Sequence, residues 1–162
     1  MNLIGQIINA MIAYYAGDVR RINHFLKVYG FAKAIGEMEG LDESTQEIIE
    51  IAALTHDIGI KNSEKKYNSS AGNYQQIEGP PEAKKLLAEL GIESGVIDRV
   101  CWLIAHHHTY TDIQGIDYQI LVEADFLVNF YEDDMSIDSV NSAGGKMFKT
   151  LSGKAILNAI YS

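Results

Sequence analysis

Apolar residues recur every three or four positions along most of this chain, which is the spacing typical of amphipathic helices. In residues 18–39, Asp18 provides a plausible N-cap, and the apolar residues after it form one stripe. Residues 3–16 and 94–108 show the same spacing, and residues 117–131 are apolar on most of their surface. No segment alternates apolar and polar residues over the length of a strand. The sequence therefore predicts an all-α fold.

Capping signals set the bounds of a further helix over residues 44–58. Ser44 and Glu47 have the spacing of a capping box at its start, and Gly59 is a natural end for it. The last turn of this helix then carries adjacent histidine and aspartate residues at positions 56 and 57.

The segment 60–79 breaks the helical pattern. It is polar, rich in Asn, Ser and Gly, and has no periodicity, so we expect a long loop of the kind that is usually functional or mobile. Pro80 and Pro81 suit the first turn of the next helix, which we expect to end near Gly91.

Length and composition favour one domain. A chain of 162 residues with 47% hydrophobic and 22% charged residues is ordinary for a soluble globular protein, and its two prolines leave no Pro-rich linker. We therefore expect a single domain over 1–162, built as a helical bundle. A C-terminal helical tail is expected over 143–161, after a break at Gly144 and Gly145.

The net charge is −9, from 22 acidic and 13 basic residues, so the chain has no general attraction for nucleic-acid polymers or anionic membranes. Cys101 is the only cysteine, which excludes an internal disulfide and suits a cytoplasmic location. The apolar run 3–16 contains Gln and Asn and is too short to span a bilayer, so we interpret it as a core helix and not as a signal peptide. It could also pack on a second subunit, which leaves a homo-oligomer open.

The five histidines occur at three places: His24, His56 and the run 106–108. Each place has helical apolar spacing, so we expect the imidazoles to point into the core. Asp57 follows His56 directly, and Asp125 lies inside a later apolar segment. A buried carboxylate is costly unless a cation or several hydrogen-bond donors compensate for it. Imidazoles and carboxylates that converge from different helices of a bundle are typical of a metal site.

The order His24, then His56-Asp57 in ALTHDIG, then Asp125 in LVEADFLVN resembles the HD superfamily of metal-dependent phosphohydrolases. The resemblance covers residues 20–130, which is most of the chain. It implies a helical bundle of the HD-domain type in which these four residues bind a divalent metal that activates water to attack a phosphorus centre. Such ligands suit Fe, Mn, Co, Ni or Zn better than Ca, and Mg stays a further candidate.

Members of this superfamily that bind two metals have additional histidines between the HD pair and the last aspartate. The stretch IAHHHTY lies at one such place, where we expect His106 to be a ligand, His107 a second ligand and His108 a rim residue. At the other place, bacterial dinucleoside-tetraphosphate hydrolases of the superfamily have His before Gly-Pro, whereas this chain has Glu78. Glu78 is either a substituted ligand or a carboxylate stabilised by the dipole of the next helix. Whether the site binds one ion or two therefore remains open.

Positive charge for a phosphate group is available near the predicted site. Lys61 follows the HD pair closely, and Arg21 precedes His24 by one helical turn, so both are candidate phosphate contacts. With two ions present, Asp57 would bridge them or orient the attacking water. Asp57 and Lys61 are thus the predicted catalytic residues.

The leading hypothesis is a metal-dependent phosphohydrolase acting on a small phosphorylated compound such as a nucleotide or dinucleotide. A minority of HD-type proteins use a di-iron centre on the same ligand pattern to oxidise a carbon substrate, so an oxygenase is the first alternative. The second alternative is a module that binds metal or nucleotide without turnover, for which the glutamate at position 78 leaves room.

Overall fold

The computed structural model describes residues 2–162, and this part of the chain contains nine helices and no strand. The predicted all-α fold is confirmed. The helices are α1 (Leu3–Tyr14), α2 (Val19–Met38), α3 (Glu43–Thr55), α4 (Ile60–Tyr67), α5 (Gly72–Glu89), α6 (Ser94–His106), α7 (Ile116–Glu132), α8 (Ile137–Met147) and α9 (Leu151–Ile160).

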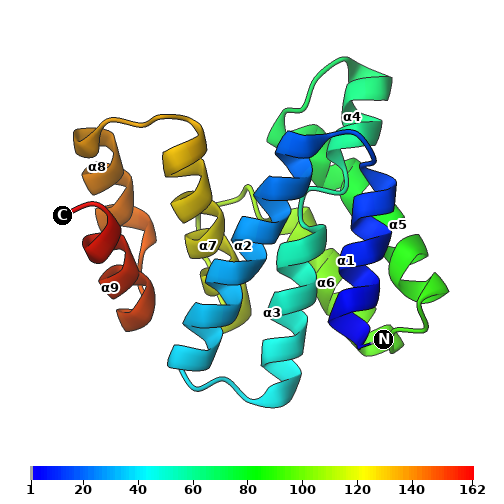
Figure 1. The fold of residues 1–162 in the computed structure, drawn as a ribbon, viewed down its shortest axis with the longest axis horizontal. Helices are drawn as coiled ribbons and strands as arrows, with labels where there is room; N and C mark the ends of the chain where they lie inside the picture. The colour runs from blue at the N-terminus through cyan, green and yellow to red at the C-terminus, as the bar shows by residue number, and fades with distance from the viewer. Residues whose placement is uncertain (1) are drawn as a thin grey trace.

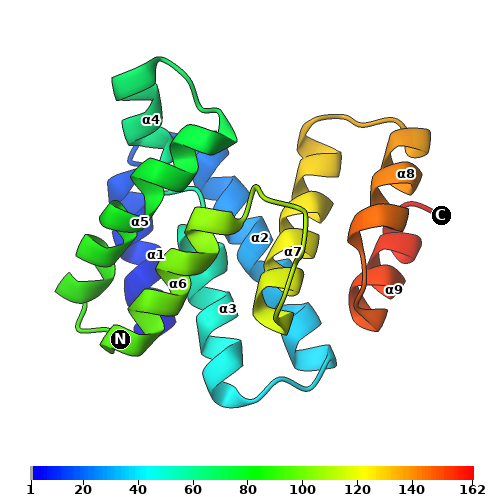
Figure 2. The same cartoon turned by 180° about the vertical axis from the view of Figure 1, so that it is seen from behind.

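Helices α2, α3 and α7 form the middle of the bundle (Figure 1). Helices α1, α5 and α6 lie on one side of them, and α8 and α9 lie on the other, as the reverse view also shows (Figure 2). Helix α2 packs against both α3 and α7, so side chains from these three helices can meet in the core. The N-terminal helix contributes Ile7 and Met11 to that core, as its apolar spacing predicts. None of the helices described is long and apolar enough to cross a membrane.

Aspartates begin the two helices that carry the first histidines. The Oδ1 atom of Asp18 accepts a hydrogen bond of 3.2 Å from the backbone N of Arg21, so the predicted N-cap of α2 is confirmed. Helix α3 is capped by Asp42, whose Oδ1 lies 2.7 Å from the backbone N of Thr45. The predicted cap at Ser44 is therefore wrong. Both side chains can cap a helix, but a carboxylate also interacts favourably with the positive end of the helix dipole.

The prediction of a long loop over 60–79 is wrong. Helix α4 occupies the first part of this segment, and α5 begins at Gly72, so Pro80 and Pro81 lie inside α5 and not in its first turn. Apolar periodicity could not indicate these helices because several of their buried positions are polar. The buried residues include Ser63 in α4 and Gln75 and Glu78 in α5.

A close approach of two glycines joins the HD segment to α5. A Cβ atom added to Gly59 would lie 2.7 Å from the backbone N of Gly79 and from the backbone O of Gln75. Any side chain at position 59 would force the backbones apart, because real Cβ atoms do not approach this closely. The glycine that follows the HD pair therefore holds the end of α3 against α5.

Residues 143–161 comprise the end of α8 and then α9, so the predicted break at Gly144 and Gly145 is wrong. The Gly-Gly pair lies inside α8, where a Cβ atom on Gly144 would be 2.5 Å from Leu157 Cδ2 of α9. The glycine therefore permits close packing of these helices and does not mark a break. The start of α9 is held by Glu123 of α7, which is fully buried and accepts hydrogen bonds from the backbone N (3.0 Å) and Oγ1 (2.6 Å) of Thr150.

Candidate metal centre

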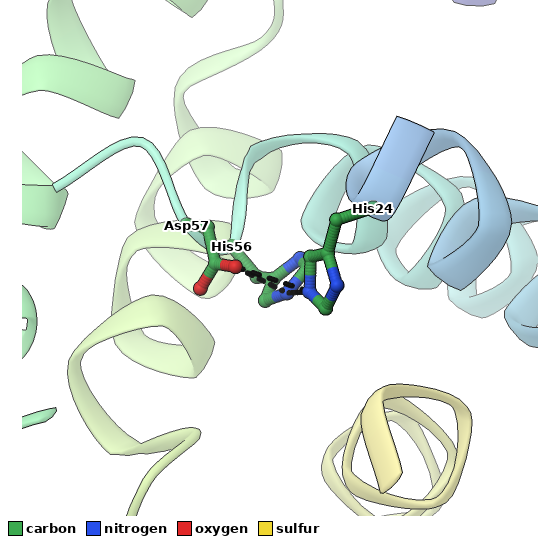
Figure 3. A group of neighbouring side chains, drawn as sticks. All are labelled: His24, His56 and Asp57. Carbon is green, nitrogen blue, oxygen red and sulfur yellow. Dashed lines mark hydrogen bonds and ion pairs between the residues drawn. The ribbon is translucent and has the colours of Figure 1, made fainter. Parts of the chain in front are cut away.

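Four potential ligands converge between α2, α3 and α7. His24 lies in the first half of α2, His56 is the C-cap of α3, Asp57 follows it, and Asp125 lies midway along α7. In Figure 3, the ring of His24 faces His56 and Asp57 across the gap between two helices. The packing of α2 on α3 and α7 thus brings together residues separated by as many as 101 positions in the sequence (125 minus 24).

The ligand atoms of these residues are evenly spaced. His24 Nε2 lies 3.1 Å from Asp57 Oδ2 and 3.2 Å from Asp125 Oδ1. His56 Nε2 lies 3.3 and 3.4 Å from the same two oxygens, and the two imidazole nitrogens are 3.2 Å apart. Ligand atoms bound about 2.1 Å from one ion lie roughly 3.0–3.4 Å apart at right or tetrahedral angles. The spacing therefore fits a single divalent metal ion. We name these four residues the first donor group.

Two buried polar atoms support this fit. Asp125 Oδ1 and His107 Nε2 have no hydrogen-bond partner among the described residues. Leaving such an atom buried and unsatisfied costs about 1–3 kcal/mol. A cation would satisfy both atoms, because a carboxylate oxygen and an imidazole nitrogen are ordinary metal ligands.

The electrostatics of the first donor group also favour bound positive charge. Burial alone would lower the pKa of His24, but the carboxylates of Asp125 and Asp57 outweigh burial and raise that pKa to about 10. Burial opposes the charged form of His56 too, and the same carboxylates hold its pKa well above the ordinary value. The pKa values of Asp57 and Asp125 are correspondingly lowered, against the effect of burial, mainly by His56. Protons or a metal ion can supply this positive charge.

A second donor group shares Asp57 with the first. It consists of Asp57, His107 and His108, whose potential ligand atoms all lie within 4.8 Å of one another. His107 is buried, and its Nε2 lies 3.5 Å from Asp57 Oδ1. His108 Nε2 lies 3.0 Å from Gln75 Oε1. Burial and the neighbouring His107 lower the pKa of His108 to about 4, which keeps its ring neutral, as a ligand requires.

The structure does not bring His106 to either donor group. Its Nδ1 donates a hydrogen bond of 2.7 Å to Trp102 O, and its ring stacks on the Trp102 indole with centroids 3.9 Å apart. Of the two ligands expected in this run, His107 lies in a donor group and His106 does not. His108, which we expected at the rim, lies in the second donor group instead.

Glu78 is also held away from the donor groups. Its Oε1 accepts a hydrogen bond of 2.6 Å from Lys66 Nζ, and its Oε2 accepts one of 3.1 Å from the Tyr67 hydroxyl. Glu78 lies inside α5 and not at its start, so neither a ligand role nor the predicted interaction with a helix N-terminus matches its placement. It links the end of α4 to α5.

A cleft of about 310 Å³ opens onto the first donor group. Arg21 lines it, but its guanidinium is already paired with Asp18, at 2.8 Å, and with Glu64. Lys61 lines a neighbouring hollow, where its Nζ donates to Tyr14 O at 3.0 Å, so the predicted role of Lys61 does not match its place. The residues that line the cleft are Asp18, Arg20, Arg21, His24, Asp57, Ile60, Ser70, Asn129 and Glu132.

Further residues of this cleft could have been found in the sequence. Asn129 and Glu132 follow Asp125 by four and seven positions on α7, so all three lie on one face of the helix. The helical spacing that indicates an apolar face therefore also identifies polar residues that share a face with Asp125 and line the cleft. Arg20 precedes His24 by four positions on α2, which is the same kind of signal. Ser70 gives none, because its position depends on the α4–α5 connection.

The chain is a helical bundle with an imidazole–carboxylate cluster that could hold a divalent metal. Residues 21–140 match the HD domain family, and the chain belongs to this family, whose members bind divalent metals and include metal-dependent hydrolases. The resemblance that the sequence indicated is thereby confirmed. The matched range includes every residue of both donor groups.

A solved structure with a similar fold is known. It is a predicted HD superfamily hydrolase from an uncultured Thermotogales bacterium, with a TM-score of 0.70 and 22% sequence identity. The similarity covers 97% of this chain and 84% of that one. At this identity the likeness establishes the fold and leaves the reaction open. No curated protein sequence matches the chain.

Proposed function

We propose that this protein is a metal-dependent phosphohydrolase that acts on a small phosphorylated compound such as a nucleotide or dinucleotide. The observation that carries the proposal is the position of Asp57. Its Oδ2 faces the imidazoles of His24 and His56, and its Oδ1 faces His107, at the base of a cleft. A carboxylate shared in this way suits a site for two ions, which is common in enzymes that hydrolyse phosphate esters and anhydrides.

The ligand residues have defined tasks in this mechanism. The first donor group would hold a divalent cation, and that cation would supply the Lewis acidity that makes water nucleophilic at neutral pH. Asp57 is placed to orient that water, because it is the one carboxylate that faces both donor groups. The burial of His56 and Asp125 excludes bulk water from the inner side, so the substrate must approach through the cleft.

The size and the lining residues of the cleft support the proposal of a small phosphorylated substrate. Its volume of about 310 Å³ is at the lower end of the range for small-molecule sites. Arg20 lines it, and its ion pair with Asp133 is exposed and 3.9 Å long, so its guanidinium can turn to a phosphate. Asn129 also lines the cleft, so its side-chain amide can bind a further polar group of the substrate. Arg21 would have to leave its carboxylate partners to join them.

Phosphate release tests this proposal directly. Purified protein would be assayed with Mn, Co, Ni, Fe and Mg against nucleoside monophosphates, cyclic nucleotides and dinucleoside polyphosphates. We expect release with at least one pairing and its loss in Asp57→Asn, which keeps the shape of the side chain but removes its charge. Lys61→Gln serves as the control, because Lys61 lies outside the cleft and should be dispensable.

Further measurements on the same samples distinguish the alternatives. Stoichiometric bound metal without phosphate release from any substrate would contradict the hydrolase proposal. Oxygen consumption by an iron-loaded sample, with a mixed-valence spectrum, would indicate an oxygenase. Nucleotide binding without turnover would indicate a binding module.

A further inference from the structure

We propose that Glu132, the last residue of α7, is a positioning residue for the metal ligand His24 and strengthens metal binding through its charge. The inference depends on the metal site of the proposed function but not on the reaction. The Nδ1 atom of His24 lies 2.5 Å from Glu132 Oε1. With Nδ1 donating to this carboxylate, Nε2 is the nitrogen left to face Asp57 and Asp125.

His56 and His107, the other two buried histidines of the donor groups, are each oriented within their own segment. His56 Nδ1 donates to Ala53 O and His107 Nδ1 donates to Ile104 O, each at 2.7 Å. These carbonyls are available because α3 and α6 end there, and the last carbonyls of a helix have no partner within it. The end of the helix therefore fixes the ring without help from elsewhere in the chain.

His24 cannot be oriented in this way. It lies inside α2, where backbone carbonyls already accept hydrogen bonds from the next turn of the helix. A partner for its Nδ1 must come from another element, and Glu132 of α7 provides it. Because the partner is a carboxylate and not a carbonyl, it also makes the imidazole a stronger ligand.

Lys27 holds Glu132 in place. Its Nζ lies 2.8 Å from Glu132 Oε2, so each carboxylate oxygen has one partner. Lys27 follows His24 by three positions, which places both side chains on the same face of α2. The carboxylate is thus held between two residues of one helix, and its position relative to the ring is fixed.

The location of Glu132 is unfavourable for the helix that carries it. A negative charge at a C-terminus interacts badly with the helix dipole, where Lys, Arg or His is preferred. The side chain is also only 11% exposed, so it is largely removed from water. A residue that breaks a local rule in this way is expected where it serves a site.

Metal titration of variants tests the inference. The dissociation constant for Mn²⁺ would be measured by competition with a chromophoric chelator in the full-length protein. We expect Glu132→Ala to weaken binding by about 10- to 100-fold, the usual effect of losing such a partner. Glu132→Gln keeps an oxygen that can accept from His24 but loses the charge, so its loss should be smaller, at least about threefold.

The chain offers a matched control. Lys33 and Glu37 form a similar pair on α2, with Nζ and Oε1 2.7 Å apart, away from the donor groups. Glu37→Ala and Glu37→Gln should leave the dissociation constant unchanged. The unfolding temperature of each metal-free variant would show whether a weaker affinity reflects general destabilisation. In the Zn²⁺-loaded protein, nitrogen-15 NMR of the histidines should show His24 protonated at Nδ1, and Glu132→Gln should shift that signal.

Each outcome is decisive. Weaker binding in the Glu132 variants, with normal binding in the Glu37 variants, supports the inference. Unchanged binding in Glu132→Gln overturns it, and this variant suffices if Glu132→Ala does not fold. His56→Ala, measured alongside, separates this failure from that of the site itself: if it too retains tight binding, the metal site is misplaced and the inference falls with it.

Discussion

The two donor groups share Asp57 but are built differently. The ligands of the first group come from three helices, and their atoms are already 3.1–3.4 Å apart. The second group adds two adjacent residues at the end of α6. In this group, Asp57 Oδ1 lies 3.5 Å from His107 Nε2. Its other imidazole, on His108, is hydrogen-bonded to Gln75 at 3.0 Å.

This difference indicates which ion binds more tightly. In the first group, Nε2 of each histidine is left free by a hydrogen bond at Nδ1. His108 Nε2 faces the amide oxygen of Gln75 and must act as a donor there, so this nitrogen can bind a metal only by giving up that hydrogen bond. Ligands held in place by packed helices lose little entropy on binding. We therefore expect the first ion to bind more tightly than the second.

The largest expected effect is that of His56→Ala. The substitution removes a fully buried ligand of the first group and leaves two carboxylates with less positive charge around them. Since loss of a residue that only supports a ligand costs about 10- to 100-fold in affinity, loss of the ligand itself should exceed about 100-fold. Metal content after dialysis, measured by elemental analysis, checks this.

A second histidine variant provides the control for His56→Ala. His106 also ends a helix and also donates its Nδ1 to a backbone carbonyl at 2.7 Å, but it lies outside both donor groups. His106→Ala should therefore keep its metal. Tight binding retained in His56→Ala, or lost in His106→Ala, would show that the first donor group is not the site.

His107→Ala has a smaller expected effect and separates the two groups. His107 contacts Asp57 but is not part of the first group, so we expect the metal-to-protein ratio to fall from two to one. The affinity of the remaining ion should change little, because the four residues of the first group are untouched. Elemental analysis over a range of added Mn²⁺ would show both effects. Loss of both ions, or of neither, would mean that the groups do not act as separate sites.

The contrast between the groups also explains what could be predicted from the sequence. His24, His56 and Asp125 are each surrounded by apolar residues at helical spacing, so their direction follows from the helices that carry them. The positions of His106, His107 and His108 depend on where α6 ends. One residue more or less of helix rotates each side chain by about 100°. Sequence spacing does not settle a helix end to that accuracy.

The α4–α5 region shows a second limit. Ser63, Gln75 and Glu78 are buried there and satisfy their polar groups by hydrogen bonds, so the segment has no apolar stripe. A polar stretch with this composition looks like a loop when burial is inferred from hydrophobicity. The direction of the Lys61 side chain could not be predicted for the same reason, since it depends on α4.

Glu78→Gln has the smallest expected effect and tests whether this residue is a metal ligand. Because its carboxylate contacts Lys66 and Tyr67 and neither donor group, the number of bound ions should be unchanged. The unfolding temperature should fall only slightly, since Lys66 is exposed and the amide can still bond to Tyr67. Elemental analysis of Glu78→Gln, with His107→Ala measured for comparison, gives the number of bound ions. If Glu78→Gln also lost one ion, α5 would have to move toward His107 when metal binds, and the second donor group would include a residue that now lies outside it.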